Sequence, residues 1–108
     1  MATLFHHLIG QVNVDTQLLA PGDIRGAIKS ISITNAYVGD TGTISLFLEE
    51  EGASSFQTFY IIKDVNLPGG STLLLDDPGM LSYDKSAYGL YARTGGLDSD
   101  VYSVLINV

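Results

Sequence analysis

Hydrophobic and polar residues alternate along most of the chain, and β-branched and aromatic residues dominate the hydrophobic positions. A period of two is typical of strands with one buried face. The C-terminal stretch 101–108 is the clearest case, because Tyr102, Val104 and Ile106 fall on one face of an extended chain. No convincing amphipathic helix interrupts the pattern, so we expect an all-β protein.

Clusters of Gly, Pro and Asp divide this pattern into short segments. Such clusters favour turns, because Pro fixes φ and Gly tolerates positive φ. The expected strands cover residues 4–14, 17–19, 26–35, 43–49, 56–65, 71–76, 87–93 and 101–108. Seven to eight short strands of this kind predict a two-sheet antiparallel sandwich, jelly-roll-like, with a small closed barrel as the alternative.

Two segments also suggest their neighbours. The connection 38–42 is short and rich in Gly and Asp, which predicts that strands 26–35 and 43–49 form a hairpin. Leu73, Leu74 and Leu75 are consecutive, so this strand is apolar on both faces. A strand of that kind is covered on both faces. It is therefore either central in the fold or in contact with a partner.

The composition fits one domain, residues 1–108, with a single hydrophobic core. Charged residues make up 16% of the chain, whereas an ordinary globular domain carries about 25%. Two explanations remain open at this point. Neighbouring chains cover part of the surface, or Ser, Thr, Asn and Gly supply the polar surface.

The charge pattern excludes some partners. The formal net charge is −7, and the five basic residues are scattered singly. Nucleic-acid binding needs clustered Lys and Arg, so we expect no nucleic-acid partner and no attraction to an anionic membrane. The chain has no cysteine, no signal-peptide pattern at its start and no apolar run of membrane-spanning length. We expect synthesis in the cytoplasm with the full length retained.

Catalytic chemistry finds little support. The only histidines, His6 and His7, are consecutive, so on a strand they point to opposite faces and cannot share one metal ion. Neither a Gly-x-Ser-x-Gly elbow nor a phosphate-binding loop is present. We therefore expect no catalytic, cofactor-binding or metal-binding residues and no bound cofactor. A hydrolase is the least favoured function.

Loop carboxylates could gather around Ca²⁺, as they do in some sandwiches. The candidates are Asp76, Asp77, Asp84, Asp98 and Asp100. No complete Asp-x-Asp-x-Asp-Gly pattern is present. We prefer the interpretation that these side chains cap turns by accepting hydrogen bonds from nearby backbone N–H groups.

Tyrosine is the main aromatic residue, and it suits either a core or a subunit contact. The candidates are Tyr37, Tyr60, Tyr83, Tyr88, Tyr91 and Tyr102. Exposed tyrosines along a groove would instead favour a carbohydrate-binding adhesion module. We expect at least half of them to fill the core.

Several runs resemble a known family. ISITNAYVGDTGTISLFLEE, FYIIKDVNLPGGSTLLLDDPGM and YGLYARTGG, followed by a short alternating strand, resemble small β-sandwich virion proteins of tailed bacteriophages, most of all those of cyanobacterial and marine phages. The resemblance covers roughly residues 28–108 and contains no site motif. It implies a structural protein of the virion, as a capsid decoration or cement protein or as a tail or fibre component.

The resemblance also implies partners. Such proteins are typically symmetric homo-oligomers, and we expect a trimer that contacts the major capsid protein or other virion proteins. Residues 1–11 are the expected site of an extended inter-subunit arm, which would pair as a strand with a neighbouring subunit.

Overall fold

The computed structural model describes residues 3–9, 15–24, 27–36, 39, 41–50, 58–77, 79–95 and 101–108. They form the strands β1 (Thr3–Ile9), β2 (Thr16–Leu19), β3 (Ser30–Asn35), β4 (Gly42–Glu50), β5 (Thr58–Leu67), β6 (Thr72–Leu75), β7 (Tyr88–Gly95) and β8 (Val101–Asn107). No part of this described chain is a helix of the length and hydrophobicity needed to cross a membrane. The all-β prediction is confirmed.

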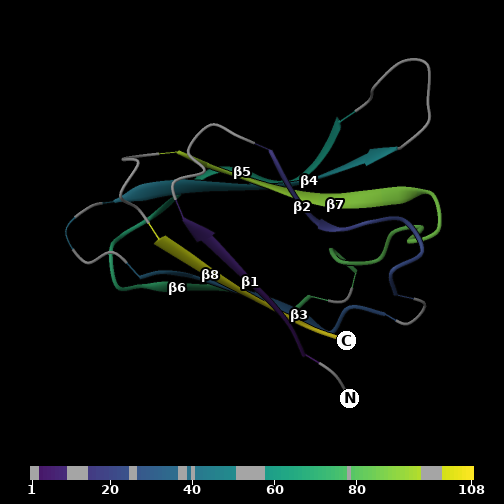
Figure 1. Ribbon diagram of the computed structural model, residues 1–108, viewed down its shortest axis with the longest axis horizontal. Coiled ribbons are helices and arrows are strands. Elements are labelled where there is room, and N and C mark those ends of the chain that lie inside the picture. The colour runs from purple at the N-terminus through teal and green to yellow at the C-terminus, as the bar shows by residue number, and fades with distance from the viewer. Residues whose placement is uncertain are drawn as a thin grey trace.

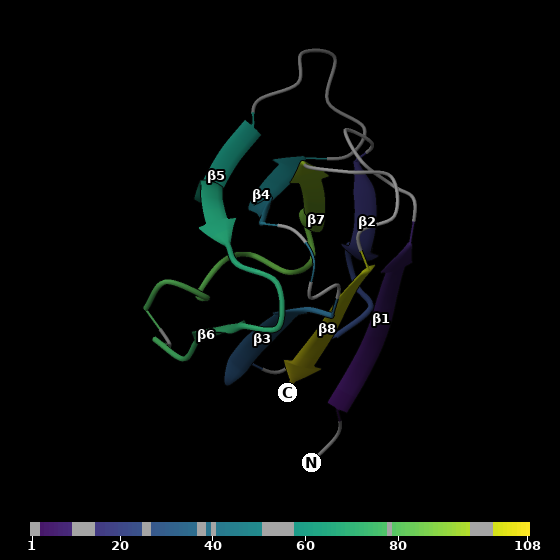
Figure 2. The same ribbon diagram turned by 90° about the vertical axis from the view of Figure 1, so that its left-hand side faces the viewer.

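The strands form two antiparallel sheets of four. Their orders are β1-β8-β3-β6 and β2-β7-β4-β5 (Figure 1). Figure 2 shows the two sheets as layers, with β1 and β2 along one side of the molecule and β5 and β6 along the other. Consecutive strands change sheet at every step except from β4 to β5. The predicted two-sheet, jelly-roll-like sandwich is confirmed.

The predicted hairpin between 26–35 and 43–49 is wrong. These segments contain β3 and β4, which lie in different sheets, and the hairpin partner of β4 is β5. A short polar connection fits a hairpin and a crossover between stacked sheets equally well. The alternation within each strand is the same in both cases, so the sequence pattern does not separate them.

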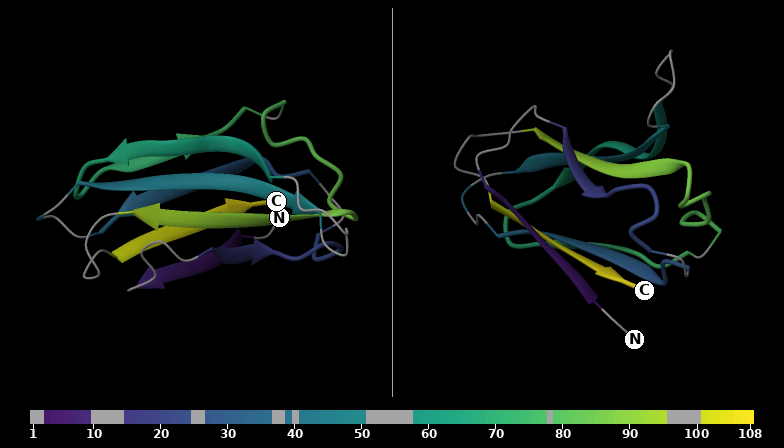
Figure 3. Two further views of the ribbon diagram at one scale, coloured as in Figure 1. Left: turned by 90° about the horizontal axis from the view of Figure 1, so that it is seen from above. Right: turned by 45° about the vertical axis from the view of Figure 1, so that its right-hand side comes forward.

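The core lies between the two layers, which are seen over one another in the right panel of Figure 3. Alternate residues of the central strands supply it, and each buried Leu, Ile or Val side chain stabilises the fold by roughly 1.5–3 kcal/mol. Its fully buried members include Ile31, Ile33, Ile44, Leu46, Leu90, Tyr102, Val104 and Ile106. The inward face predicted for strand 101–108 is thereby confirmed.

A buried amide ties the two layers together at one end. Asn35 is fully buried, and its Nδ2 donates to the carbonyl oxygen of Leu67 at 3.0 Å. Its backbone N–H donates to the Ser71 carbonyl, and its own carbonyl accepts from the N–H of Gly70. The turn between β5 and β6 is therefore fastened to the end of β3.

The N-terminal strand is docked on its own sheet. β1 pairs with β8 along its whole length, from Thr3 opposite Asn107 to Ile9 opposite Val101, and the left and right panels of Figure 3 both place the two strands side by side. The rest of the expected arm 1–11 lies outside the described residues. Pairing with a neighbouring subunit stays a prediction, and within β1 only its outer edge is left for it.

Candidate functional site: the outer faces of the two sheets

The two histidines lie on opposite faces of β1, as predicted. His6 is half-buried and turned toward the inside of the sandwich, and His7 is exposed on the outer face. The described part of the chain contains no group of three His, Asp or Glu side chains that could hold a metal ion.

Two of the three candidate loop carboxylates that the structure describes cap turns. The Asp77 carboxylate accepts a hydrogen bond from the backbone N–H of Gly79 at 2.9 Å. The Asp84 carboxylate accepts from the hydroxyl of Ser86 at 2.6 Å and from its N–H at 3.0 Å. The Ser86 hydroxyl is the largest cause that lowers the pKa of Asp84. Asp76 is exposed, and residues 98 and 100 lie outside the described chain.

A cavity of about 590 Å³ opens at one end of the sandwich, between the residues after β2 and those before β7. Its ionisable groups are engaged locally: the Lys85 ammonium lies 4.5 Å from the ring centroid of Tyr83 and donates to its carbonyl oxygen. Burial raises the pKa of Tyr83 to about 12. The ionisable groups that line the cavity therefore form contacts within the turn, and they do not converge as a set of reactive groups.

An aromatic row crosses the outer face of the sheet β2-β7-β4-β5. It consists of Gln17, Tyr91, Phe47 and Tyr60, each opposite the next in the strand register, with Lys63 at its end. Phe47 and Tyr91 stack with centroids 5.7 Å apart and planes inclined by 11°. Phe47 meets the tilted ring of Tyr60 at 5.5 Å on its other side.

Each side chain of this aromatic row makes contacts within the chain, although Tyr60 remains 49% exposed. Phe47 is 3% exposed although it points away from the core. The Lys63 ammonium lies over the ring of Tyr60 at 5.0 Å, and the side-chain amide of Gln17 donates to the Tyr91 hydroxyl. A sugar ring needs free aromatic faces to stack on. The row therefore gives little support to the carbohydrate-binding hypothesis, and its rings serve mainly to link the strands.

The remaining predicted tyrosines are divided between core and surface. Tyr102 is fully buried, and Tyr83 packs against the core. Tyr88 meets Phe59 edge to face at 6.0 Å. Residue 37 lies outside the described chain.

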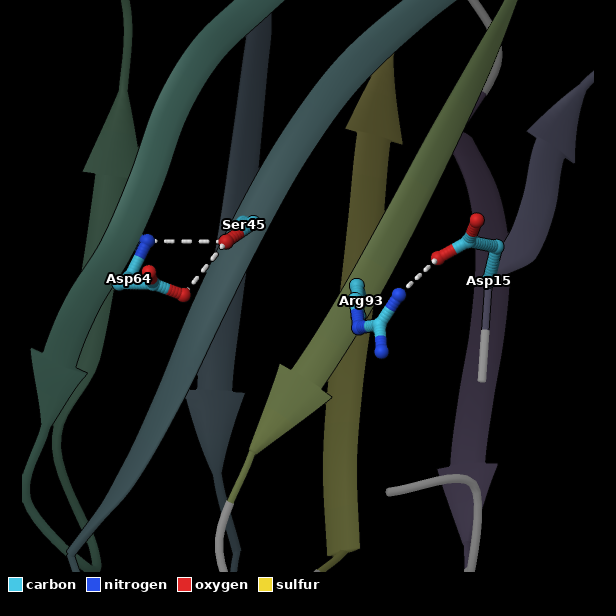
Figure 4. A network of polar contacts seen from close by, with 4 residues as sticks. All are labelled: Asp15, Ser45, Asp64 and Arg93. Carbon is cyan, nitrogen blue, oxygen red and sulfur yellow. Dashed lines mark hydrogen bonds and ion pairs between the residues drawn. The ribbon is translucent and has the colours of Figure 1, made fainter. Parts of the chain in front are cut away.

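Two charged side chains of this sheet, Arg93 and Asp64, form the polar contacts drawn in Figure 4. Arg93 pairs with Asp15 at 3.4 Å, and both side chains are about half exposed. Ser45 Oγ accepts from the N–H of Asp64 at 2.8 Å and donates to its carboxylate at 3.3 Å. This bond accompanies a bulge at which Asp64 adopts φ +50°. Arg93 and Asp64 therefore both have partners within the chain.

The other outer face carries no charge. None of the strands β1, β8, β3 and β6 contains Asp, Glu, Lys or Arg, whereas the opposite sheet contains Glu49, Glu50, Lys63, Asp64 and Arg93. We call the outer side of β1-β8-β3-β6 the uncharged face. Three rows of residues cross it in register: Thr3, Asn107 and Ser30; Phe5, Leu105, Ser32 and Leu74; His7, Ser103, Thr34 and Thr72.

The polar side chains of the uncharged face bind one another across the strands. The Thr3 hydroxyl donates to the amide oxygen of Asn107 at 2.8 Å, and the Asn107 amide donates to Ser30 Oγ at 2.7 Å. The hydroxyls of Thr34 and Thr72 share a hydrogen bond of 2.8 Å. Because these groups already have partners, covering them with protein costs less than covering free polar groups.

The middle row of the uncharged face is mostly apolar, with Ser32 between Leu105 and Leu74, and its two ends are open. Phe5 is 73% exposed and Leu74 is 56% exposed, and Leu105 lies half-buried between them. β6 is an edge strand rather than a central one. Of the two positions expected for the strand with Leu73 to Leu75, the central one is therefore wrong. The second apolar face of this strand, at Leu74, is exposed to water in the single chain.

The uncharged face was not found from the sequence. Its rows join residues that are far apart along the chain, and only the strand order brings them together. The signal was present in part, because the four strands can be seen to lack charged residues once they are known to share one sheet.

Comparison with known proteins returns no relative. No family model, no curated protein and no solved structure matches the chain. A function for this sandwich therefore rests on its own surfaces and on the sequence resemblance, since one fold carries many functions.

Proposed function

We propose that this protein is a non-catalytic structural subunit that packs against other protein subunits through the uncharged face. One observation carries the proposal. Phe5 and Leu74 are exposed on the two edge strands, at opposite ends of the middle row of a sheet face whose strands hold no Asp, Glu, Lys or Arg. Exposed apolar patches of this kind mark protein contacts.

Covering this face is energetically favourable. Burial of apolar surface contributes about 25 cal/mol per Å², and the flanking hydroxyls and amides are already bonded to one another. No ionic group of these four strands has to lose water. The low charged fraction of the chain fits the same proposal, because a surface that other subunits cover needs fewer charged residues than one that only water covers.

The place of the subunit is proposed from the resemblance of residues 28–108 to small virion proteins of tailed bacteriophages. On that basis the protein decorates or cements a capsid and stabilises the head through homo-oligomer and lattice contacts. A trimer bound to the major capsid protein is the expected form, and a tail or fibre component is the alternative. The virion is then its location.

Charge introduced at the patch tests the proposal. Leu74→Asp places a carboxylate in the middle row, whereas Thr58→Asp adds the same charge at an exposed position of β5 in the other sheet. Light scattering of concentrated protein should show that Leu74→Asp weakens association by at least about tenfold, because a carboxylate is costly to bury. Thr58→Asp should associate like the wild type. Equal association of all three proteins would contradict the proposal.

A further inference from the structure

The sandwich has four edge strands, and three of them are protected against pairing. Native proteins protect such edges with short strands, charges and bulges. β2 and β6 have four residues each, and the register of β2 against β7 is irregular. β5 is longer, but it carries Lys63 and Asp64 and two register shifts.

β1 has none of these protections. It runs for seven residues, pairs with β8 without a register shift, and contains no Lys, Asp, Glu or Pro. No described strand lies along its outer edge. In Figure 2, β1 forms the margin of its layer, and β2 forms the margin of the other layer on the same side. The backbone groups of this edge are the ones available to another strand.

An apolar groove lies beside this edge. It has a volume of about 330 Å³, and most of its lining is apolar: Leu4 and Phe5 of β1, Leu18 and Leu19 of β2, and Ile24. His6 and Asp23 complete the lining, and the Asp23 carboxylate accepts a hydrogen bond from the backbone N–H of Ala20. A strand added to β1 would turn alternate side chains into this opening between the two layers. The strand that fits must therefore alternate, with apolar side chains on the inward side.

β1 itself has the required pattern. Leu4, His6 and Leu8 point inward, and Phe5 and His7 point outward. The chain carries a formal charge of −7, and a strand without carboxylates is a place where two copies can approach with little repulsion. We infer that the outer edge of β1 binds β1 of a second copy, antiparallel and about a two-fold axis.

Full-length antiparallel pairing fixes the register. All seven residues are used only when His6 lies opposite His6 of the second copy, with Leu4 opposite its Leu8 and Phe5 opposite its His7. The leucines then reach the grooves of both copies, and the two uncharged faces join into one wider face. The contact is isologous, so it closes as a pair. It is a different contact from the trimer expected from the sequence resemblance.

The expected contact is small, so the test needs concentrated protein. Seven residues extend over about 23 Å at roughly 3.3 Å per residue, which places this interface at the small, transient end of protein contacts. The inference rests on the proposed function for the claim that copies associate at all. It adds which edge they use and in which register.

Disulfide trapping tests the register, because the chain has no cysteine of its own. Directly opposite residues of antiparallel strands have Cα atoms about 4.5–5.5 Å apart, which a disulfide can span. Under mild oxidation of concentrated protein, His6→Cys should form linked pairs at least about tenfold faster than Thr58→Cys, which lies at an exposed position of β5 in the other sheet. Wild-type association is measured in parallel.

The outcomes separate the two proposals. Association of the wild type with no faster linking of His6→Cys than of Thr58→Cys overturns the β1 pairing and leaves the proposed function standing. A wild-type chain that stays single at every concentration overturns both. If His6→Cys does not fold, hydrogen exchange of the wild type tests the β1 pairing instead. Amides of Thr3–Ile9 should gain protection with concentration while those of β2 do not, and equal behaviour of the two edges overturns the inference.

Discussion

Two phenylalanines on opposite outer faces allow one substitution to be compared in two environments. Phe47 lies in the aromatic row and is 3% exposed, whereas Phe5 lies on the uncharged face and is 73% exposed. Phe47→Ala should destabilise the folded monomer without changing its association. Phe5→Ala should leave folding almost unchanged and weaken association.

The magnitudes follow from burial. Truncation of a buried Phe costs about 3–5 kcal/mol, and Phe47 also loses two ring contacts, each worth about 0.5–1.5 kcal/mol beyond its buried area. Tyr60 and Tyr91 can close over part of the gap at the surface, so we expect about 3 kcal/mol. Phe5 has about a quarter of its surface covered, which corresponds to about 0.5 kcal/mol of the 1.5–3 kcal/mol for full burial.

Urea denaturation of dilute protein measures the free energy of unfolding, and light scattering of concentrated protein measures association. The reasoning is refuted if Phe47→Ala costs less than about 1 kcal/mol, since the row would then not link the strands. It is refuted equally if Phe5→Ala destabilises the monomer as much as Phe47→Ala does.

Three further predictions concern single positions. The pKa of Tyr83 is raised from 10.0 to about 12 by burial, so the stability that its neutral phenol contributes is complete below pH 10 and is lost as the pH rises toward 12. When the pH is raised from below 10 to above 10, the melting temperature should therefore fall more for the wild type than for Tyr83→Phe. Equal falls would contradict the assignment. A Cβ at Gly42 would overlap the hydroxyl of Tyr102 and lie 2.9 Å from the carbonyl oxygen of Gly95; Gly42→Ala should cost about 1–3 kcal/mol in urea denaturation, and a neutral result would refute this crowding. Asp15 forms an exposed pair with Arg93, so Asp15→Ala should cost at most about 0.5 kcal/mol, and any loss should vanish in high salt; a larger cost at high salt would be inconsistent with simple surface pairing.

The sequence predicted which residues of the C-terminal strand face inward. Tyr102, Val104 and Ile106 are buried as expected, because one face of β8 covers the core. It also predicted an apolar second face at Leu74, because three consecutive leucines cannot all point inward from one strand. Both predictions depend only on the alternation of side chains, which is a local property.

The sequence could not predict which strands become neighbours. The step from β3 to β4 crosses between sheets although its connection resembles a hairpin turn. Phe47 points outward from a strand whose Ile44, Leu46 and Leu48 face the core, and its burial arises from Tyr60 and Tyr91 on adjacent strands. The bulge at Asp64 likewise depends on Ser45 of the paired strand.

The central claim is that the sheet β1-β8-β3-β6 is completed by other protein subunits. Sedimentation equilibrium of the wild-type chain, from micromolar concentrations to about 1 mM, tests it most directly. The average mass should rise above the 11.5 kDa of one chain as the concentration increases. A mass of one chain across the whole range would contradict the claim.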